Sequence, residues 1–398
     1  MLTKAYIPYG GYYSSPFCKW QGSLANENAI ELGARTARQW LERKGWEGAP
    51  FDYLYLGITV GQQRVFYGST WAAAMMGVRV PGMTVMQACS TATTCVFNAA
   101  MSIEQGLLLS PLCLLVDRCS NGPHTIWPNP LGPGGEVISE NWNMDNMNGD
   151  PATGHPMVVT AENVAREAGF TREEADELAI LRYEQYVAAL KDDRAFQKRY
   201  MVPVEARVGR KQMVRVEADE GVTPCTAEGL QRLKPVVAEG IHTFGSQTHP
   251  ADGNAALLVT TKERAAELSA DPSVSIRVVS YGFARTRPAF MPAAPVPAAR
   301  MALERAGIGI KDVTVIKTHN PFAANDLYFA KELGVGWAEF NNFGSSMIFG
   351  HPQAPTVARL LIEGIEEAVL RGGGHVLVAG CAAGDTGAAL VLKVDTAA

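Results

Sequence analysis

Apolar and polar residues alternate along the chain in two blocks that repeat the same order of elements. In each block, two strand-like apolar runs flank a segment with the apolar spacing of a helix. We expect the strands at residues 4–10 and 51–60 in the first block and at 275–283 and 312–320 in the second, with helices at 26–46 and 295–308. Both helices end in Leu-Glu-Arg-x-Gly, where the glycine is placed to stop a helix. Residues 1–118 and 272–398 are therefore predicted to be two copies of one α/β unit with mainly parallel, buried sheets.

The repeat extends to residues that can carry chemistry. Each block continues with a long helical segment, which follows Cys89 in the first block and His351 in the second, and then an apolar strand, at 112–117 or 375–380. The reactive residue lies about the same distance before the strand in both blocks. We therefore predict a Cys–His pair across a pseudo-two-fold axis. With Cys381 directly after the last strand, this pattern indicates covalent acyl chemistry.

Residues 119–249 repeat neither block. They open with a run rich in Pro, Gly and Asn that reads as loop, and residues 160–193 follow as a strongly helical segment. Thr171 and Glu174 have the spacing of a capping box. We expect an inserted domain that lies over the core and covers the substrate site, with residues 250–271 returning to complete the first half.

The overall composition excludes several classes of protein. The chain has 398 residues, 47% of them hydrophobic, a net charge of −5 and no basic field suited to nucleic acid. It has no uninterrupted apolar run long enough for a membrane span, and its start lacks the apolar core of a signal peptide. Seven cysteines without paired CxxC spacing argue against a disulfide framework or a zinc site. We expect a cytoplasmic protein without a metal.

Cys89 and His351 each have two readings. A cysteine at a helix N-terminus has a lowered pKa and favours the thiolate, but free cysteines are often small buried hydrophobes. His351, in Gly-His-Pro, can take a proton from a thiol or can simply cap a helix.

Cys381 and His319 are also open to two interpretations. Cys381 lies in a turn of small residues whose free N–H groups can bind an oxyanion, although a plain turn between strands has the same composition. His319 ends the strand that matches residues 51–60, where sites in α/β proteins collect, or it is a structural histidine. His155, His242, His249 and His375 are weaker candidates.

Taken together, these segments resemble the thiolase superfamily, the acyl-CoA acetyltransferases and 3-ketoacyl-CoA thiolases. The resemblance covers nearly the whole chain and rests on several segments in the family's order. They are ACSTATTCVFNAAMSIEQG from Ala88, TAENVAREAGFTREEADELA from Thr160, ADGNAALLV from Ala251, GHPQAPTVARLL from Gly350 and GCAAGDTGAALVL from Gly380. The resemblance implies a layered αβαβα fold built from two α/β halves. The His319-Asn320-Pro321-Phe322 motif departs from the Asn-Glu of many members and is similar to sterol-carrier thiolases.

The resemblance also implies roles for the reactive residues. Cys89 would carry the acyl group as a thioester, His351 would accept its proton, and Cys381 would be the second acid/base. His319 would contribute to one oxyanion hole, and the backbone N–H groups of Cys89 and of the turn at Gly384 would form the other. Bulk at Ala382, Ala383 and Asp385, where the family is usually glycine-rich, is expected to reshape the pocket.

Coenzyme A would be a co-substrate, with no tightly bound cofactor. The residues expected to bind it or the acyl group are Thr248, His155, Arg210, Phe322 and Met157.

The implied reaction is thiolytic cleavage of a 3-ketoacyl-CoA. Aromatic residues suggest a bulky or aromatic substrate, such as benzoylsuccinyl-CoA; they are Tyr6, Tyr9, Tyr12, Tyr13, Phe17, Trp20, Trp127 and Trp142. One alternative is a β-ketoacyl synthase-type condensing enzyme, which lacks the second cysteine. Another is a non-catalytic, thiolase-like subunit that binds acyl-CoA within a complex. We expect a homodimer or a dimer of dimers, with a small zinc-ribbon/OB-fold protein as a further partner to be tested.

Overall fold

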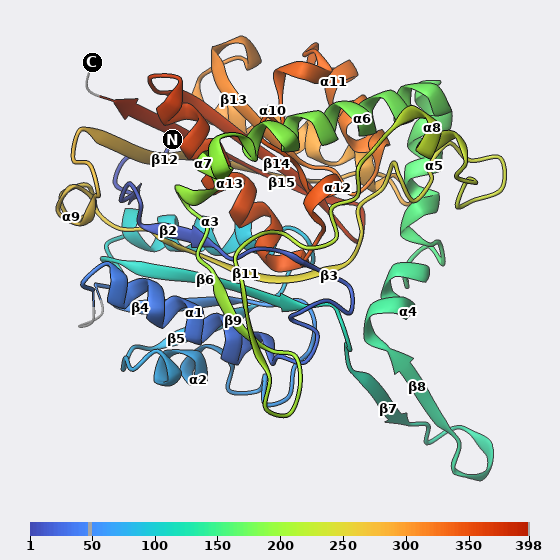
Figure 1. Cartoon of the computed structure of the whole chain (residues 1–398), viewed down its shortest axis with the longest axis horizontal. Helices are drawn as coiled ribbons and strands as arrows, with labels where there is room; N and C mark the ends of the chain where they lie inside the picture. The colour runs from blue at the N-terminus through green and yellow to red at the C-terminus, as the bar shows by residue number, and fades with distance from the viewer. Residues whose placement is uncertain (47–49, 397–398) are drawn as a thin grey trace.

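Two β-sheets enclose a pair of buried helices, and further helices cover the outer faces of both sheets. The computed structural model describes residues 1–46 and 50–396. The layers follow one another as helix, sheet, helix, sheet, helix (Figure 1). This confirms the predicted αβαβα arrangement.

The first sheet has six strands in the order β2-β11-β6-β4-β5, with β3 paired to β11. Its strands are β2 (Tyr12–Ser14), β3 (Cys18–Lys19), β4 (Tyr53–Gly57), β5 (Gly82–Val85), β6 (Pro111–Arg118) and β11 (Ala251–Leu258). Helices α1 (Ala29–Arg43) and α2 (Gly68–Met75) pack on its outer face.

The second sheet has five strands in the order β1-β12-β15-β14-β13. They are β1 (Tyr6–Ile7), β12 (Val274–Arg285), β13 (Val313–His319), β14 (Gly374–Ala382) and β15 (Thr386–Thr396). Helix α10 (Pro295–Ala306) covers its outer face beside α11 (Ala323–Leu333), and α9 (Lys262–Leu268) contacts β1.

The central layer consists of α3 (Thr91–Glu104) and α13 (Gln353–Leu370), which contact each other and both sheets. They are the helices that follow Cys89 and His351. Because they occupy corresponding positions in the two halves, their N-termini meet between the sheets. The short helix α12 (Ser346–Phe349) precedes α13.

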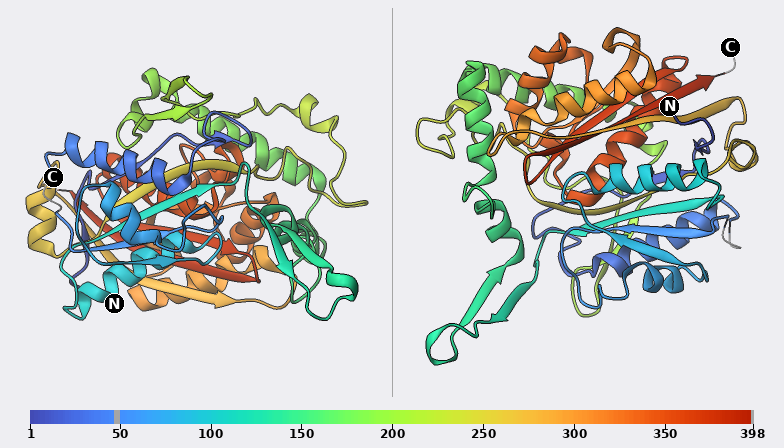
Figure 2. Two further views of the ribbon diagram at one scale, coloured as in Figure 1. Left: turned by 90° about the horizontal axis from the view of Figure 1, so that it is seen from below. Right: turned by 180° about the vertical axis from the view of Figure 1, so that it is seen from behind.

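Residues 119–249 form a hairpin, several helices and a small ribbon. The hairpin of β7 (His124–Pro128) and β8 (Val137–Asn141) projects away from the body of the molecule (Figures 1 and 2), in a stretch expected to be loop. The rest comprises α4 (Trp142–Asn148), α5 (Met157–Ala168), α6 (Arg172–Ala189), α7 (Lys191–Lys198), β9 (Val204–Arg207), β10 (Met213–Val216) and α8 (Ala227–Gln231). Single helical turns lie at Pro133–Gly135, Met291–Ala293, Ile310–Asp312 and Trp337–Glu339. The capping box of Thr171 and Glu174 at the start of α6 is confirmed.

Two expectations about strands are wrong. The run at 4–10 is not one strand of the first half: it breaks near Gly10, which has φ 72°, so β1 joins the second sheet and β2 the first. The sheets are mixed, because only β4, β5 and β6 in one and β13 and β14 in the other run parallel. The turn between β14 and β15 explains one antiparallel pair, since positive φ at Gly384 and Asp385 lets the chain reverse directly.

Within the described residues, every helix is too short or too polar to cross a lipid bilayer.

Candidate active site

The Cys89 thiol meets the His351 imidazole where the two central helices begin. Cys89 Sγ lies 3.0 Å from His351 Nε2, although the residues are 262 positions apart. Cys89 follows Ala88, which has φ 44°, and precedes α3. His351 follows Gly350, where φ is 91° and a Cβ atom would lie 2.8 Å from both Ala251 Cβ and His249 Cε1. Only glycine fits there, so the backbone of this turn fixes where His351 enters the site.

The hydroxyl of Thr356 sets the tautomer of His351. His351 Nδ1 lies 2.7 Å from Thr356 Oγ1, and that hydroxyl donates to the carbonyl of Pro352 at 3.2 Å. Because a hydroxyl has one proton, Thr356 Oγ1 accepts from His351 Nδ1–H. This network assigns a lone pair to His351 Nε2, so the Cys89 thiol donates to it and His351 is arranged as a base.

His319 has the same tautomer for a parallel reason. Its Nδ1 lies 2.8 Å from Ser346 Oγ, and the Ser346 hydroxyl donates to Asn320 Oδ1 at 3.0 Å. The Met347 N–H also donates to Asn320 Oδ1, which fixes that atom as an acceptor. Ser346 Oγ therefore accepts from His319 Nδ1–H, and His319 Nε2 has a lone pair. That nitrogen is buried without a partner among the described residues, and the ring lies 4.1 Å from the His351 ring, centroid to centroid.

The expectation that helix α3 lowers the pKa of Cys89 is wrong. Burial raises the pKa of the Cys89 thiol to about 12, and the negative charge of Asp117 adds to the rise. The backbone N–H groups of Ala383 and of Cys89 itself act in the opposite direction but are weaker. Desolvation outweighs the helix terminus here, so the thiol rests protonated and depends on His351 to remove its proton.

Both histidines are neutral at rest. Burial lowers the pKa of His319 to about 3. Burial also lowers the pKa of His351 well below its usual value, and the nearby His319 and His249 lower it further. A neutral imidazole is the state that accepts a proton.

Cys381 is buried at the end of β14, next to the Cys89 thiol. Burial raises the pKa of Cys381, and a negative charge on Cys89, present when that residue is a thiolate, raises it further. Asn325 Nδ2 donates to Cys381 Sγ at 3.2 Å. The turn that follows brings the Ala383 N–H to Cys89, and Gly384 next to it has φ 82°.

Asp385 anchors this turn. Its carboxylate accepts from the N–H groups of Ala289 and Phe290, both at 2.9 Å. An acidic residue is thus accommodated where a glycine was expected, because its side chain points away to the 289–290 backbone.

The expected binding residues fall into two groups. Thr248 hydrogen bonds through its N–H to the Pro321 carbonyl at 2.7 Å and through its hydroxyl to the Ser346 carbonyl at 2.5 Å, directly behind His319. Phe322 and Met157 share a buried apolar cluster with Cys381. By contrast, His155 and Arg210 are exposed, Arg210 in the turn between β9 and β10.

Most of the early aromatic residues lie in the core. Tyr12 donates to Glu366 at 2.7 Å, Tyr13 donates to Asn254 at 2.9 Å, and the Phe17 ring packs edge-on against Phe349. These three side chains are occupied in packing, so they do not line an acyl pocket. Of the later ones, Trp127 is half exposed on the hairpin, and Trp142 donates to the Thr59 carbonyl at 2.9 Å.

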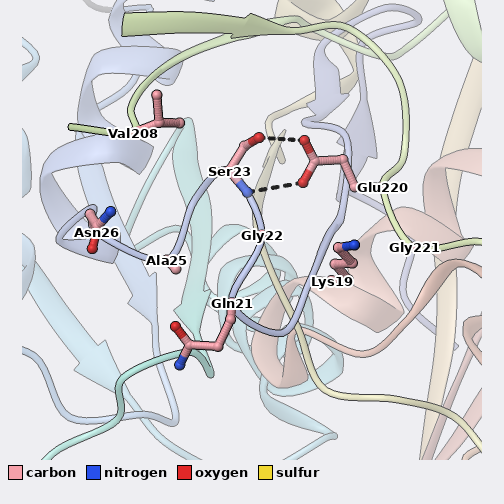
Figure 3. Close-up of a pocket in the computed structure, with 9 residues that line it drawn as sticks. All are labelled: Lys19, Gln21, Gly22, Ser23, Ala25, Asn26, Val208, Glu220 and Gly221. Carbon is pink, nitrogen blue, oxygen red and sulfur yellow. Dashed lines mark hydrogen bonds between the residues drawn. The ribbon is translucent and has the colours of Figure 1, made fainter. Parts of the chain in front are cut away.

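A separate open cavity of about 610 Å³ lies between the loop after β3 and the β9–β10 region (Figure 3). It is lined by Lys19, Ser23 and Glu220 among others, and by none of the four reactive residues. Ser23 donates through its N–H and its hydroxyl to Glu220. Two of the polar residues that line the cavity therefore pair with each other.

Several positioning residues were missed in the sequence. Asn325, Ser346 and Thr356 each hold one reactive side chain, but nothing in their local sequence distinguishes them from ordinary helix or loop residues. His249 was placed among the weaker candidates, yet its carbonyl accepts the His351 N–H at 2.9 Å and its ring packs against Gly350.

With this geometry in view, comparison with known proteins identifies the family. The profile of the thiolase N-terminal domain matches residues 11–263, and that of the thiolase C-terminal domain matches residues 273–394. The chain belongs to the thiolase family, a family of acyltransferases.

Individual thiolases are similar along the whole chain. The beta-ketothiolase of Cupriavidus necator is 31% identical, over 94% of this chain and 95% of that protein. The acetyl-CoA acetyltransferase of Escherichia coli is 30% identical, over 94% of this chain and 95% of that protein.

Solved thiolase structures share the fold. The acetyl-CoA acetyltransferase of Bacillus anthracis has a TM-score of 0.90 at 27% identity, covering 99% of both chains. Human mitochondrial 3-ketoacyl-CoA thiolase in complex with CoA has a TM-score of 0.88 at 24% identity, covering 98% of both chains.

Proposed function

We propose that this protein is a CoA-dependent thiolase that cleaves a 3-ketoacyl-CoA through an acyl-enzyme on Cys89. The observation that carries the proposal is the 3.0 Å contact between Cys89 Sγ and the lone-pair nitrogen of His351. A thiol and a neutral imidazole in that relation form an activated nucleophile. Membership of the thiolase family supports the reaction class.

The reaction has two half-reactions. First, His351 Nε2 takes the Cys89 proton and the thiolate attacks the keto carbon. The bond between the keto carbon and its neighbour then breaks, and the electron pair stays as an enolate beside the CoA thioester. The enolate takes a proton from the Cys381 thiol and leaves as a shortened acyl-CoA. In the second half-reaction, the Cys381 thiolate takes the thiol proton of free CoA, and the CoA sulfur attacks the Cys89 thioester. The remaining acyl group leaves as its CoA ester, and the released Cys89 thiolate takes back its proton from His351.

The environment of Cys381 supports its role as the acid. Burial raises the pKa of this thiol, so it stays protonated until an enolate forms beside it. The Asn325 amide, which donates to Cys381 Sγ, would then stabilise the thiolate that remains.

The two expected oxyanion holes differ in whether their hydrogen-bond donors are already in place. The N–H groups of Cys89 and Ala383, with Gly384 next in the turn, point toward the sulfur and are donors in every protonation state. His319 Nε2 has a lone pair in the neutral ring, so it can donate to a thioester oxygen only after gaining a proton or changing tautomer.

We propose a bulky or aromatic acyl group as the finer specificity. The apolar cluster beside Cys381, which includes Met157, Met291 and Phe322, supports this. A screen of linear and aromatic 3-ketoacyl-CoA esters tests it, by following the loss of keto-thioester absorbance. Faster turnover of short linear esters than of aromatic ones would reject it.

Self-association is proposed as well. Strand β5 is one edge of the first sheet, with Met83 half exposed there, and the β7–β8 hairpin exposes Ile126, Trp127 and Leu131. Exposed apolar residues on an edge strand and a projecting hairpin favour association of two or four copies. Sedimentation of the full chain tests this, and a monomer at micromolar concentration would reject it.

A cytoplasmic location and a small zinc-ribbon/OB-fold partner remain proposals too. The reduced state expected for seven free cysteines supports the first. Co-expression with such a partner followed by co-purification tests the second.

Two variants test the chemistry. Cys89→Ser should abolish turnover, since an alcohol is a far weaker nucleophile than a thiol. Cys381→Ser should still form the acyl-enzyme slowly but fail to exchange the carbon–carbon bond. Equal loss of both half-reactions in Cys381→Ser would contradict the division of roles.

Labelling with iodoacetamide, with and without an acyl-CoA, separates the alternatives. A non-catalytic binding subunit would show Cys89 no more reactive toward iodoacetamide than buried Cys113, and acyl-CoA would not protect it. A β-ketoacyl synthase-type enzyme would acylate Cys89 from an acyl-carrier protein and would not need Cys381.

A further inference from the structure

We infer that Cys89, His319 and His351 together form a binding site for a thiophilic divalent cation, with Zn²⁺ the best match. Cys89 Sγ and one ring nitrogen of each histidine all lie within 4.8 Å of one another. With a Zn–S distance of ~2.3 Å and a Zn–N distance of ~2.0 Å, a tetrahedral site needs ligand atoms roughly 3.3–3.6 Å apart. The side chains therefore need only small movements to close on a cation. The inference goes beyond thiolase activity and does not depend on it.

The second argument is the orientation of the two rings. Each Nδ1–H is held by a hydroxyl, of Thr356 for His351 and of Ser346 for His319. Each Nε2 is thus left with a lone pair, which is the form of histidine that binds zinc. A fixed partner on the other ring nitrogen is also what orients histidine ligands in metal sites.

The third argument is the unsatisfied nitrogen. His319 is fully buried, and its Nε2 has no hydrogen-bond partner among the residues that the structure describes. A buried polar atom without a partner is destabilising, so a ligand that takes up this lone pair is favoured. A cation does so, and the nearby Asp117, whose charge acts on Cys89, would partly balance the charge of the cation.

Binding would compete with acyl transfer. The cation replaces the proton of the Cys89 thiol, which leaves to solvent, and a metal–sulfur bond forms. The lone pair of His351 Nε2 is then bound to the cation and cannot accept a thiol proton. The coordinated sulfur of Cys89 is no longer free to attack a carbonyl. Because the three ligands come from positions 89, 319 and 351, no local cysteine spacing reveals the site.

The test uses the full chain with Co²⁺ and Zn²⁺ as probes and needs no substrate. We expect one Co²⁺ per chain with a sulfur-to-cobalt absorption band, displaced by Zn²⁺. His319→Ala should weaken binding at least about tenfold, as loss of a ligand or its support does. Cys225→Ser is the control, because Cys225 is the one free cysteine that is only half-buried in the described chain, and it should leave binding unchanged.

A second measurement on the unaltered protein guards against a folding defect in His319→Ala. Zn²⁺ should block alkylation of Cys89 by iodoacetamide, a chelator should restore it, and alkylated protein should lose the cobalt band. Binding that survives alkylation, or equal affinity in His319→Ala, would overturn the inference. Neither result bears on turnover, so the proposed thiolase function is tested separately.

Discussion

At the scale of single residues, the reactivity of Cys89 depends on the hydroxyl of Thr356, which acts on the thiol through the His351 ring. Thr356 accepts the Nδ1 proton of His351 and so directs the other nitrogen, with its lone pair, at the thiol. The thiol has a pKa raised to about 12 by burial, so without this base it has little thiolate near neutral pH.

Thr356→Val should therefore lower kcat and the rate of Cys89 alkylation by about ten- to a hundredfold, the range typical for loss of an orienting partner. Valine matches threonine in shape, so KM and the melting temperature should change less than kcat. Thr356→Ser is the matched control, because it keeps the hydroxyl. An equally inactive Thr356→Ser, or a fully active Thr356→Val, would contradict the assignment of the tautomer.

Asp252 gives a prediction about pH. Burial raises its pKa to about 6, and one of its carboxylate oxygens has no partner among the described residues. Because the folded protein then binds a proton more tightly than the unfolded chain, this group stabilises the fold at low pH. That contribution is lost as pH rises from about 4 to 6, at up to ~1.4 kcal/mol per pH unit.

Asp252→Asn removes this titration. In urea unfolding, the free energy of unfolding of Asp252→Asn relative to the native protein should improve between pH 4 and pH 7. A difference that does not change with pH would mean that Asp252 does not titrate in this range.

The sequence predicted the reactive residues better than the residues that hydrogen bond to them and orient them. Cys89, His351, His319 and Cys381 stand out because each follows or ends an apolar element at a repeated position. Their protonation states could not be predicted, because burial and hydroxyl partners such as Ser346 and Thr356 come from distant segments. The pKa of Cys89 shows this most clearly: the helix start is visible in the sequence, but the desolvation that outweighs it is not.

At the scale of elements, one carboxylate joins the parts that carry the site. Asp117, near the end of β6, accepts from the N–H groups of Thr59 and Val60 after β4 and from the N–H of Ala354 at the start of α13. It also accepts from the Thr59 hydroxyl at 2.7 Å. The first half thus holds the helix that presents His351.

Asp117→Asn would turn an amide NH₂ toward these donors. We expect a loss of about 1–3 kcal/mol in the free energy of unfolding per unsatisfied group, and slower acylation because the start of α13 shifts. Asp252→Asn is the matched control at neutral pH. Asp252 is as deeply buried as Asp117, but one of its oxygens has no donor among the described residues, so an amide NH₂ placed there faces no N–H group. Equal destabilisation by the two substitutions in chemical unfolding would contradict this reasoning.

The order of elements could be predicted, and their pairing could not. The repeated Leu-Glu-Arg-x-Gly phrases do end helices, with Gly45 and Gly307 at positive φ. The break of the first strand near Gly10, and its transfer to the other sheet, depend on pairing with β12, some 270 residues later. Strand direction likewise depends on contacts that no local pattern records.

At the scale of the whole molecule, a buried charge network ties the inserted segment to the central helix. Arg359 on α13 forms a double hydrogen bond with Asp219, at 2.7 and 2.8 Å, and also pairs with Glu363 at 3.0 Å. Tyr200, from the inserted segment, donates to Glu363 at 2.6 Å. Residues 200 and 219 therefore hold α13 in place through buried polar contacts.

Asp219→Ala would leave Arg359 buried with a single partner. We expect a loss of about 3–5 kcal/mol in the free energy of unfolding, as for other broken buried pairs. Glu42→Ala is the control: its pair with Arg38 has a similar length, 2.9 Å, but is exposed, so its loss should be below about 1 kcal/mol. If denaturant unfolding showed a similar loss of unfolding free energy in both variants, the buried network would contribute no more to stability than an exposed ion pair.

The central claim is that two halves of the chain converge on one nucleophile, Cys89, served by His351. The most direct measurement is mass spectrometry of the protein after brief exposure to an acyl-CoA. We predict one acyl group per chain, on Cys89 alone, and none in His351→Ala. An acyl group on another cysteine, or undiminished acylation in His351→Ala, would contradict the account.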